Sequence, residues 1–265
     1  MSQRRQSGVM SSDPRLYVGQ DLHTGQPVAL PKEDTHYLVN VMRRGEGDTV
    51  RLFNGRDGEW SARIVEAGRK AVIIEPLDRT REQAEVPDLW LLFAPVKRQK
   101  TDLIVEKATE LGVARICPVS TARTQSDRIK TERFRLIAKE AAEQTERLDL
   151  PEVHELDRLD RVLDGWDGAR KLIYCDEAGD ETDAPWGGAR GRGVPMLEAV
   201  SGMAGAPAAI LIGPEGGFSP EERTRLRDHD FVIPVTLGPR ILRAETAAVT
   251  ALALWQAACG DWRTV

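Results

Sequence analysis

Short apolar runs separated by turn residues fill the first third of the chain. The runs lie at 16–18, 28–30, 49–53, 60–65 and 71–74, and turn dipeptides such as Asn54-Gly55 and Asp57-Gly58 lie between them. Runs of this length between turn residues are typical of β-strands. One helix is expected over 32–43, with Gly45 ending it. This pattern predicts a small β-barrel domain over residues 1–80, followed by a polar linker over 78–88.

After residue 88 the apolar pattern changes to strands that alternate with helices. Residues 89–93 are continuously apolar, which is typical of a strand buried on both faces. Further strands are expected at 116–119, 172–174, 208–212 and 231–235, and helices at 102–111, 131–147, 220–227 and 244–257. Gly112 is placed to end the first of these helices. The alternation predicts an α/β domain with a mostly parallel sheet over residues 85–265. Residues 178–207, rich in Gly, Ala and Pro, are expected to form an exposed insertion with one helical turn near 196–201.

The charge is unevenly distributed. The net charge is −5, yet residues 97–139 hold eleven Lys and Arg against five Asp and Glu. A basic segment in an acidic chain is compatible with a face that contacts RNA phosphates, although a solvated helix surface explains the charge equally well. The candidate phosphate contacts are Lys97, Arg98, Lys100, Arg123, Arg128 and Arg133.

Several classes of protein are disfavoured by what the sequence lacks. No apolar run is long enough to cross a membrane. The polar N-terminal tail has no signal-peptide pattern, so we expect a cytoplasmic protein. The four histidines and three cysteines never fall at metal-ligand spacing, so we expect no metal site.

The strongest local signal is a glycine-rich turn at 213–217, between an apolar strand and a helix. Ser219 is expected to cap the helix, Pro220 to occupy its first position and Glu222 to complete a capping box. The Gly-x-x-Gly-Gly spacing matches neither the dinucleotide fingerprint nor the phosphate-binding loop that ends in Gly-Lys-Ser/Thr. Ligands of open α/β sheets bind at such strand ends, and glycines let a flat ligand approach the main chain. A well-capped turn without a ligand is the alternative.

A second turn of the same kind follows the last strand. Residues 235–246 again read strand, Gly-Pro and helix, with Arg240, Arg243 and Glu245 beside the turn. The helix that follows is apolar on nearly every side, so we expect it to be buried or in an interface. Two Gly-Pro turns after two strands predict two walls of one pocket. A local ion pair between Arg243 and Glu245 is the alternative for those two side chains.

These segments resemble a known family. The stretches 213–219 and 237–247 resemble the two signature motifs of the ribosomal RNA small subunit methyltransferase E family, the bacterial 16S rRNA uridine-N3 methyltransferases. Residues 107–113 with Pro118 and Arg123, and 140–147 with Pro151, are similar to two further family segments. Residues 36–43 with Gly47-Asp48 resemble the family's PUA-like RNA-binding domain. The sequence departs from the expected pattern at 122–124 and at Thr145.

The resemblance implies an architecture, a cofactor and partners. It implies a SPOUT-type α/β domain whose C-terminal segment forms a deep trefoil knot, and a homodimer. The methyl donor, S-adenosylmethionine, would be held at Leu211, Gly213, Pro214, Gly216, Leu237, Gly238, Ile241 and Leu242. The partner would be 16S rRNA in the small ribosomal subunit. The N-terminal domain, with Arg43, and the basic segment would contact this RNA.

The chemistry of uracil suggests roles for four side chains. N3 of uracil carries a proton and is a poor nucleophile until that proton leaves. A cation beside O2 or O4 would therefore stabilise the uracil anion that forms. Arg243 is the first candidate for this cation, and Arg123, either from the same chain or from the partner subunit of a dimer, is the second. Glu215 or Glu245 would accept the proton or orient an arginine, and the sequence does not choose between them.

Three other functions remain as alternatives. The first is methylation of another RNA position, a ribose 2′-hydroxyl or a transfer RNA. Ribose enzymes of this class are expected to carry a Ser-x-Asn motif where this chain has Arg243-Ala-Glu245, which favours uracil. The second is a non-catalytic RNA-binding factor in ribosome assembly. The third, a nucleotide-dependent phosphotransferase, is disfavoured because the chain lacks the phosphate-gripping lysine.

Overall fold

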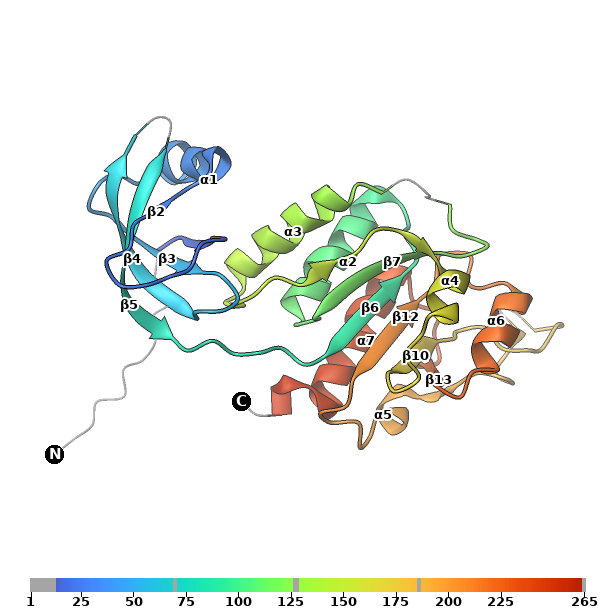
Figure 1. The fold of residues 1–265 in the computed structure, drawn as a ribbon. Coiled ribbons are helices and arrows are strands. Elements are labelled where there is room, and N and C mark those ends of the chain that lie inside the picture. Colours follow the sequence, from blue (N-terminus) through green and yellow to red (C-terminus); the bar gives the residue numbers. More distant parts are fainter. Residues whose placement is uncertain (1–12, 69–70, 126–128, 185–186, 264–265) are drawn as a thin grey trace. The chain divides into compact units, whose positions relative to one another are not determined.

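The computed structural model describes residues 13–68, 71–125, 129–184 and 187–263. Its internal contacts divide the chain after Glu85 into an N-terminal and a C-terminal unit, and Figure 1 shows the elements of each. Of the residues that the sequence analysis singled out, Arg128 lies outside the described residues. The two units are described separately.

The N-terminal unit is one mixed β-sheet with a short helical segment. Its strands run in the order β1-β3-β4-β5-β2, with β1 parallel to β3 and the other neighbours antiparallel. The strands are β1 (Arg15–Tyr17), β2 (Val28–Ala29), β3 (Thr49–Phe53), β4 (Glu59–Ala67) and β5 (Val72–Arg81). All five strands contribute buried side chains to one core, as in the small barrel that the sequence predicts.

Two details of this unit differ from the expectation. The helix is shorter than 32–43: α1 (Lys32–His36) continues as a π-helical turn (Tyr37–Val41) and Arg43 has a positive φ of 54°. The predicted linker over 78–88 is wrong in its first part, because β5 continues to Arg81. Its last residue pairs with Glu59 of β4, so a polar strand end is held by backbone pairing rather than by apolar burial.

The C-terminal unit is built on a parallel sheet, as predicted. The strands run in the order β11-β13-β10-β12-β6-β7-β8, and β9 also pairs with β7. They are β6 (Leu89–Phe93), β7 (Arg115–Ser120), β8 (Glu152–Val153), β9 (Asp157–Arg158), β10 (Lys171–Cys175), β11 (Val194–Pro195), β12 (Ala208–Ile212) and β13 (Val232–Thr236). Sequence reasoning missed β8, β9 and β11, which are only two residues long.

Helices cover both faces of this sheet (Figure 1). Alternate residues of β6 and β12 point to opposite faces, so Leu91 and Ile210 enter one core and Leu92 and Leu211 the other. The first core packs against α2 (Arg98–Glu110), α3 (Thr131–Gln144), α5 (Met196–Ala199) and α7 (Ala244–Cys259). The second packs against α4 (Leu159–Asp164) and α6 (Pro220–Arg227).

The ends of the helices follow local chemistry with two exceptions. Gly112 follows α2 with a φ of 75°, and α6 has the predicted capping box at Ser219 and Glu222. However, α2 begins four residues before the expected start at 102. There the Thr101 hydroxyl donates to the Val96 carbonyl and accepts from its N–H. Helix α3 ends at Gln144 rather than at 147, since Glu146 has a φ of 64°.

The strand order brings the two Gly-Pro turns to one edge of the sheet. Strand β10 lies between β12 and β13, and all three run parallel. The turns after β12 and β13, and the residues after β10, therefore meet at the carboxyl ends of three adjacent strands. This is where open α/β sheets bind their ligands.

Candidate functional site

A cavity of about 670 Å³ opens at these three strand ends. Both Gly-Pro turns contribute to its wall, together with the segment after β10 and the start of α7. The lining residues are Lys100, Arg123, Cys175, Asp176, Glu177, Ala178, Ile212, Gly213, Pro214, Glu215, Gly216, Gly217, Phe218, Ile241, Leu242, Arg243, Ala244 and Ala247. The volume lies within the ~300–1,000 Å³ of small-molecule and cofactor sites.

Close packing requires glycine at the start of the first turn. A Cβ on Gly213 would lie 2.5 Å from Cε2 of Phe218, and the Phe218 ring packs edge-on against Tyr174, with ring centroids 5.0 Å apart. Gly217 has a φ of 66°, which favours glycine. The turn therefore exposes main chain to the cavity while its aromatic neighbour is fixed in the core.

The helix after this turn is held at its N-terminal end by its own cap and by a neighbouring loop. At the cap of α6, Glu222 accepts hydrogen bonds from the backbone N–H groups of Ser219 and Ala122, at 2.8 and 2.7 Å. The Arg123 guanidinium donates to the Gly216 carbonyl at 2.8 Å. Arg123 therefore lies at the cavity of its own chain, on the loop that follows β7.

The second turn brings a cation to the cavity. Arg243 is exposed, lines the cavity and forms no ion pair with any of the described residues. The alternative of an Arg243–Glu245 ion pair is thus not what the structure shows. Ile241 is 47% exposed, so this wall presents an apolar surface next to a free guanidinium.

Glu215 is paired with a lysine instead of an arginine. Lys100 Nζ lies 2.5 Å from Oε1 of Glu215 and 3.7 Å from Oε1 of Glu245. The hydrogen bond from Lys100 lowers the pKa of Glu215, helped by the charge of Lys100 and, at longer range, of Lys97 and Arg243. Glu215 is therefore a weak base at neutral pH. The ammonium of Lys100, which the sequence suggested as an RNA contact, is engaged inside the site.

Sequence reasoning missed an acidic pair after β10. Asp176 forms ion pairs with Arg223 and Arg227 of α6, at 3.1 and 2.6 Å, and so ties that helix to the sheet. Neither carboxylate oxygen of Glu177 accepts a hydrogen bond of normal geometry, although both are buried. Burial raises the pKa of Glu177, and the nearby Leu237 N–H and the charge of Arg192 oppose this shift. The position of both residues directly after a predicted strand was the signal that could have found them.

The remaining predicted residues lie around the cavity or away from it. Leu211 and Leu237 pack into the cores, so only their main chain is available, and Gly238, with a φ of 119°, exchanges two hydrogen bonds with Thr236. On α3, Arg133 pairs with Asp102 at 2.5 Å. The exposed Lys97 and Arg98 lie at the start of α2, and Arg43 is exposed on the N-terminal unit. The described residues contain no cluster of ligands for a metal ion and no helix suited to crossing a membrane.

Two family models match the chain. An RNA methyltransferase domain matches residues 82–256, and an RNA methyltransferase PUA domain matches residues 30–77. Together they cover both units of the structure. The cavity and its two turns lie within the first match.

Relatives of known name and structure extend this similarity over nearly the whole chain. Ribosomal RNA small subunit methyltransferase E of Rickettsia conorii is 30% identical over 240 residues, 90% of this chain and 93% of that protein. A methyltransferase of Legionella pneumophila, solved with its bound cofactor SAM, is 31% identical, with a TM-score of 0.80 over 95% of this chain and all of that chain. The Neisseria gonorrhoeae ribosomal RNA small subunit methyltransferase E, solved with S-adenosylmethionine, is 28% identical, with a TM-score of 0.77 over 94% of this chain and 99% of that chain. The chain thus belongs to the ribosomal RNA small subunit methyltransferase E family, within the S-adenosylmethionine-dependent RNA methyltransferases.

Proposed function

We propose that this protein transfers the methyl group of S-adenosylmethionine to N3 of one uridine in 16S rRNA. One observation carries the proposal: two Gly-Pro turns, from the parallel strands β12 and β13 on either side of β10, contribute to one cavity, and Arg243, which forms no ion pair with the described residues, lies in its wall. The donor supplies a methyl group that is already activated on a sulfonium. The protein must then align N3, stabilise the uracil anion and exclude water.

The chemistry of the cavity fits a cationic donor with a flat adenine. Gly213, Gly216 and Gly217 line the cavity and leave main-chain groups open to an adenine edge. Glu177 places a buried carboxylate without a hydrogen-bond partner in the same wall. A buried carboxylate is costly to ionise unless a cation faces it, and the donor carries a sulfonium and an ammonium group. The backbone of Leu237, Gly238, Ile241 and Leu242 would complete the donor site.

The side chains in and beside the cavity would have different roles in the reaction at the uracil. Arg243 stabilises the developing negative charge beside O2 or O4, because its guanidinium forms no ion pair with the described residues that would have to be broken first. Glu215, which lines the cavity, is held ionised by Lys100 and is a weak base. Glu245, the other candidate acceptor, lies beside the same lysine, with its Oε1 3.7 Å from Lys100 Nζ, and is not among the residues that line the cavity. Arg123, bonded to Gly216, orients the turn and reaches the substrate from its own chain.

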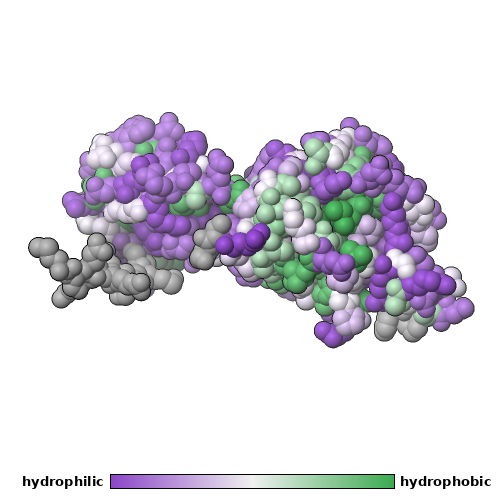
Figure 2. Space-filling model, turned by 90° about the horizontal axis from the view of Figure 1, so that it is seen from below, coloured by the Kyte–Doolittle hydropathy of each residue, from purple (hydrophilic) through white to green (hydrophobic). Residues whose placement is uncertain are grey.

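The trefoil knot and the homodimer implied by the resemblance, and the cytoplasmic location expected from the polar N-terminal tail, belong to the same proposal. An apolar surface supports the dimer. Figure 2 shows hydrophobic residues gathered in patches on the C-terminal unit, and exposed apolar side chains there include Leu103 and Ile241. Exposed apolar patches mark interaction surfaces. Sedimentation equilibrium tests this part alone, with twice the chain mass as the expected result.

A deletion strain tests substrate and product together. Mass mapping of ribosomal RNA from cells lacking this gene should show the loss of one methyluridine in the small-subunit RNA, restored by the wild-type gene. Loss of a 2′-O-methyl group or of a transfer-RNA modification would instead favour another RNA position. An unchanged methylation map would favour a non-catalytic assembly factor.

A further inference from the structure

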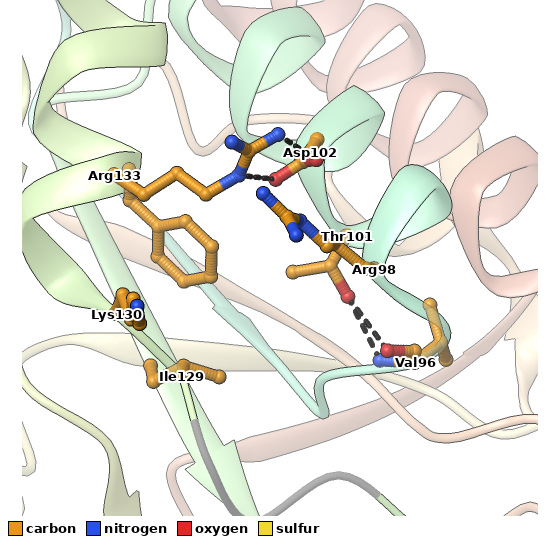
Figure 3. Close-up of a pocket in the computed structure, with 8 residues that line it drawn as sticks. Val96, Arg98, Thr101, Asp102, Ile129, Lys130 and Arg133 are labelled. Atoms are coloured by element: carbon orange, nitrogen blue, oxygen red, sulfur yellow. Dashed lines mark hydrogen bonds and ion pairs between the residues drawn. The ribbon is translucent and has the colours of Figure 1, made fainter.

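A second cavity, of about 210 Å³, lies between the first turns of α2 and α3 (Figure 3). Its lining residues are Val96, Arg98, Thr101, Asp102, Ile129, Lys130, Arg133 and Phe134. Arg98 and Arg133 lie at one end in this view, and Ile129 and Lys130 at the other. None of these residues lines the 670 Å³ cavity.

The walls of this cavity combine apolar surface with unpaired cations. Val96, Ile129 and Phe134 provide the apolar part, and Phe134 is fixed against Phe93 in the core. Arg98 and Lys130 form no ion pair with the described part of the chain. Arg133 donates two hydrogen bonds to Asp102, at 2.9 and 2.5 Å. Arg133 is therefore part of the wall, but its positive charge is neutralised by Asp102.

The helix ends at the cavity add to the positive potential. Lys97 and Lys130 occupy the N-cap positions of α2 and α3, and neither helix has a side-chain cap. A helix N-terminus carries a partial positive charge, so cations there are unfavourable until an anion approaches. The first turn of α2 contains no acidic residue, whereas that of α3 contains Glu132, which is paired with Arg135. Two uncapped helix ends and two cations without an ion pair to the described residues therefore favour an anionic group at the rim.

A third cavity connects this site to the proposed donor site. It measures about 190 Å³ and shares Val96 and Arg98 with the cavity between the helices. It shares Arg123 and the 214–216 turn with the 670 Å³ cavity. The 190 Å³ cavity is thus a neighbour of both others, and an RNA strand whose target base enters the 670 Å³ cavity could reach the cavity between α2 and α3 by passing over it.

We propose that the cavity between α2 and α3 binds a second nucleotide of the RNA substrate, one that flanks the target uridine. The base lies against Val96, Ile129 and Phe134, and the neighbouring phosphates contact Arg98 and Lys130. This inference rests on the proposed function. The cavity is larger than the ~150 Å³ apolar cavity that accepts benzene, so a planar base fits. Single-stranded RNA is commonly recognised through bases that are turned out of the stack and lie against aromatic side chains, beside cations that contact the backbone.

The test measures binding of a 16S rRNA fragment as a function of salt, using the full chain. Arg98→Ala and Lys130→Ala should each lower the slope of log K against log salt by roughly 0.7–1, because each removes one phosphate contact. Ile129→Trp, which fills the cavity, should weaken binding roughly tenfold without changing the slope. Arg161→Ala, an exposed arginine of α4, is the matched control and should leave both quantities unchanged. Donor affinity and melting temperature, measured for all four variants, should equal those of the wild type.

Two outcomes overturn the inference while the proposed function stands. In one, the wild type methylates the RNA and all three cavity variants bind it with wild-type affinity and slope. In the other, Ile129→Trp converts a dimer into a monomer, which would show that a second copy of the chain occupies the cavity. If the wild-type protein neither binds nor methylates the RNA, the proposed function is wrong, and so is this inference.

Discussion

Lys100 Nζ lies 2.5 Å from Oε1 of Glu215, and this ion pair joins the first helix of the parallel-sheet unit to its glycine-rich turn. The two residues are 115 positions apart in the sequence. The contact keeps Glu215 ionised, and the positive charge of Lys100 is neutralised by Glu215 inside the site. It also leaves Arg243 as a cation in the cavity wall with no ion pair to the described residues.

Lys100→Met should have a small, pH-dependent effect on stability. The folded-state pKa of Glu215 is lowered by Lys100, so this pair stabilises the protein at neutral pH, and the contribution is lost as the pH falls through that lowered pKa. Because the side chains are 22% and 34% exposed, we expect a loss below ~1 kcal/mol. Urea unfolding at neutral and at acidic pH measures it, with Arg98→Met of the same helix as control, because Arg98 is exposed and forms no ion pair with the described residues. A loss that persists at acidic pH would argue against the pair as its source.

Gly213→Ala should damage the site more than an ordinary glycine substitution. The new Cβ would lie 2.5 Å from the Phe218 ring, whose edge-on packing against Tyr174 prevents an easy shift. Overpacking of this kind costs ~1–3 kcal/mol, and we expect donor binding to be lost as the turn moves. Gly168→Ala is the control, since nothing lies within 4 Å of the added atom. Thermal melting and calorimetric titration with S-adenosylmethionine compare the two. Equal behaviour of the variants would contradict the packing argument.

Glu177→Gln should stabilise the protein and weaken donor binding. Burial raises the folded-state pKa of this carboxyl, so its ionised form costs stability once the pH rises above the ordinary carboxyl value. The neutral amide removes that cost, while a cationic donor loses its counter-charge. In the wild type, donor affinity should also fall as the pH drops through the raised pKa. Urea unfolding and donor titration at several pH values measure both effects. Glu198→Gln, an exposed residue, is the control, and a destabilised Glu177→Gln variant would refute the argument.

Much of this arrangement could be predicted from local sequence. The strands β3, β6 and β12 and the helix α6 begin and end where the apolar pattern and the capping residues predict. Each of these depends on residues that are close in sequence. The Lys100–Glu215 pair and the packing of Glu177 depend on strand order instead, which the pattern does not specify. The continuation of β5 to Arg81 likewise depends on its partner strand.

Arg243→Ala should lower turnover by roughly 10²–10³ with little change in donor affinity, because we propose that Arg243 acts on the developing uracil anion. Arg243→Lys should recover only part of the rate, since a lysine does not reproduce the planar guanidinium. Single-turnover methylation of small subunits and donor titration separate the two steps. Arg161→Ala serves as the control. A variant that loses donor affinity and rate together would place Arg243 in donor binding.

Nucleoside analysis after methylation in vitro tests the central claim most directly. Purified protein is incubated with 16S rRNA in small subunits and S-adenosylmethionine carrying a labelled methyl group, and the RNA is digested to nucleosides. The account predicts that the label is found in N3-methyluridine alone, at one site, and that Arg243→Ala lowers the rate of labelling by roughly 10²–10³-fold. Label in a ribose 2′-O-methyl nucleoside, or no label above that of protein-free RNA, would contradict it.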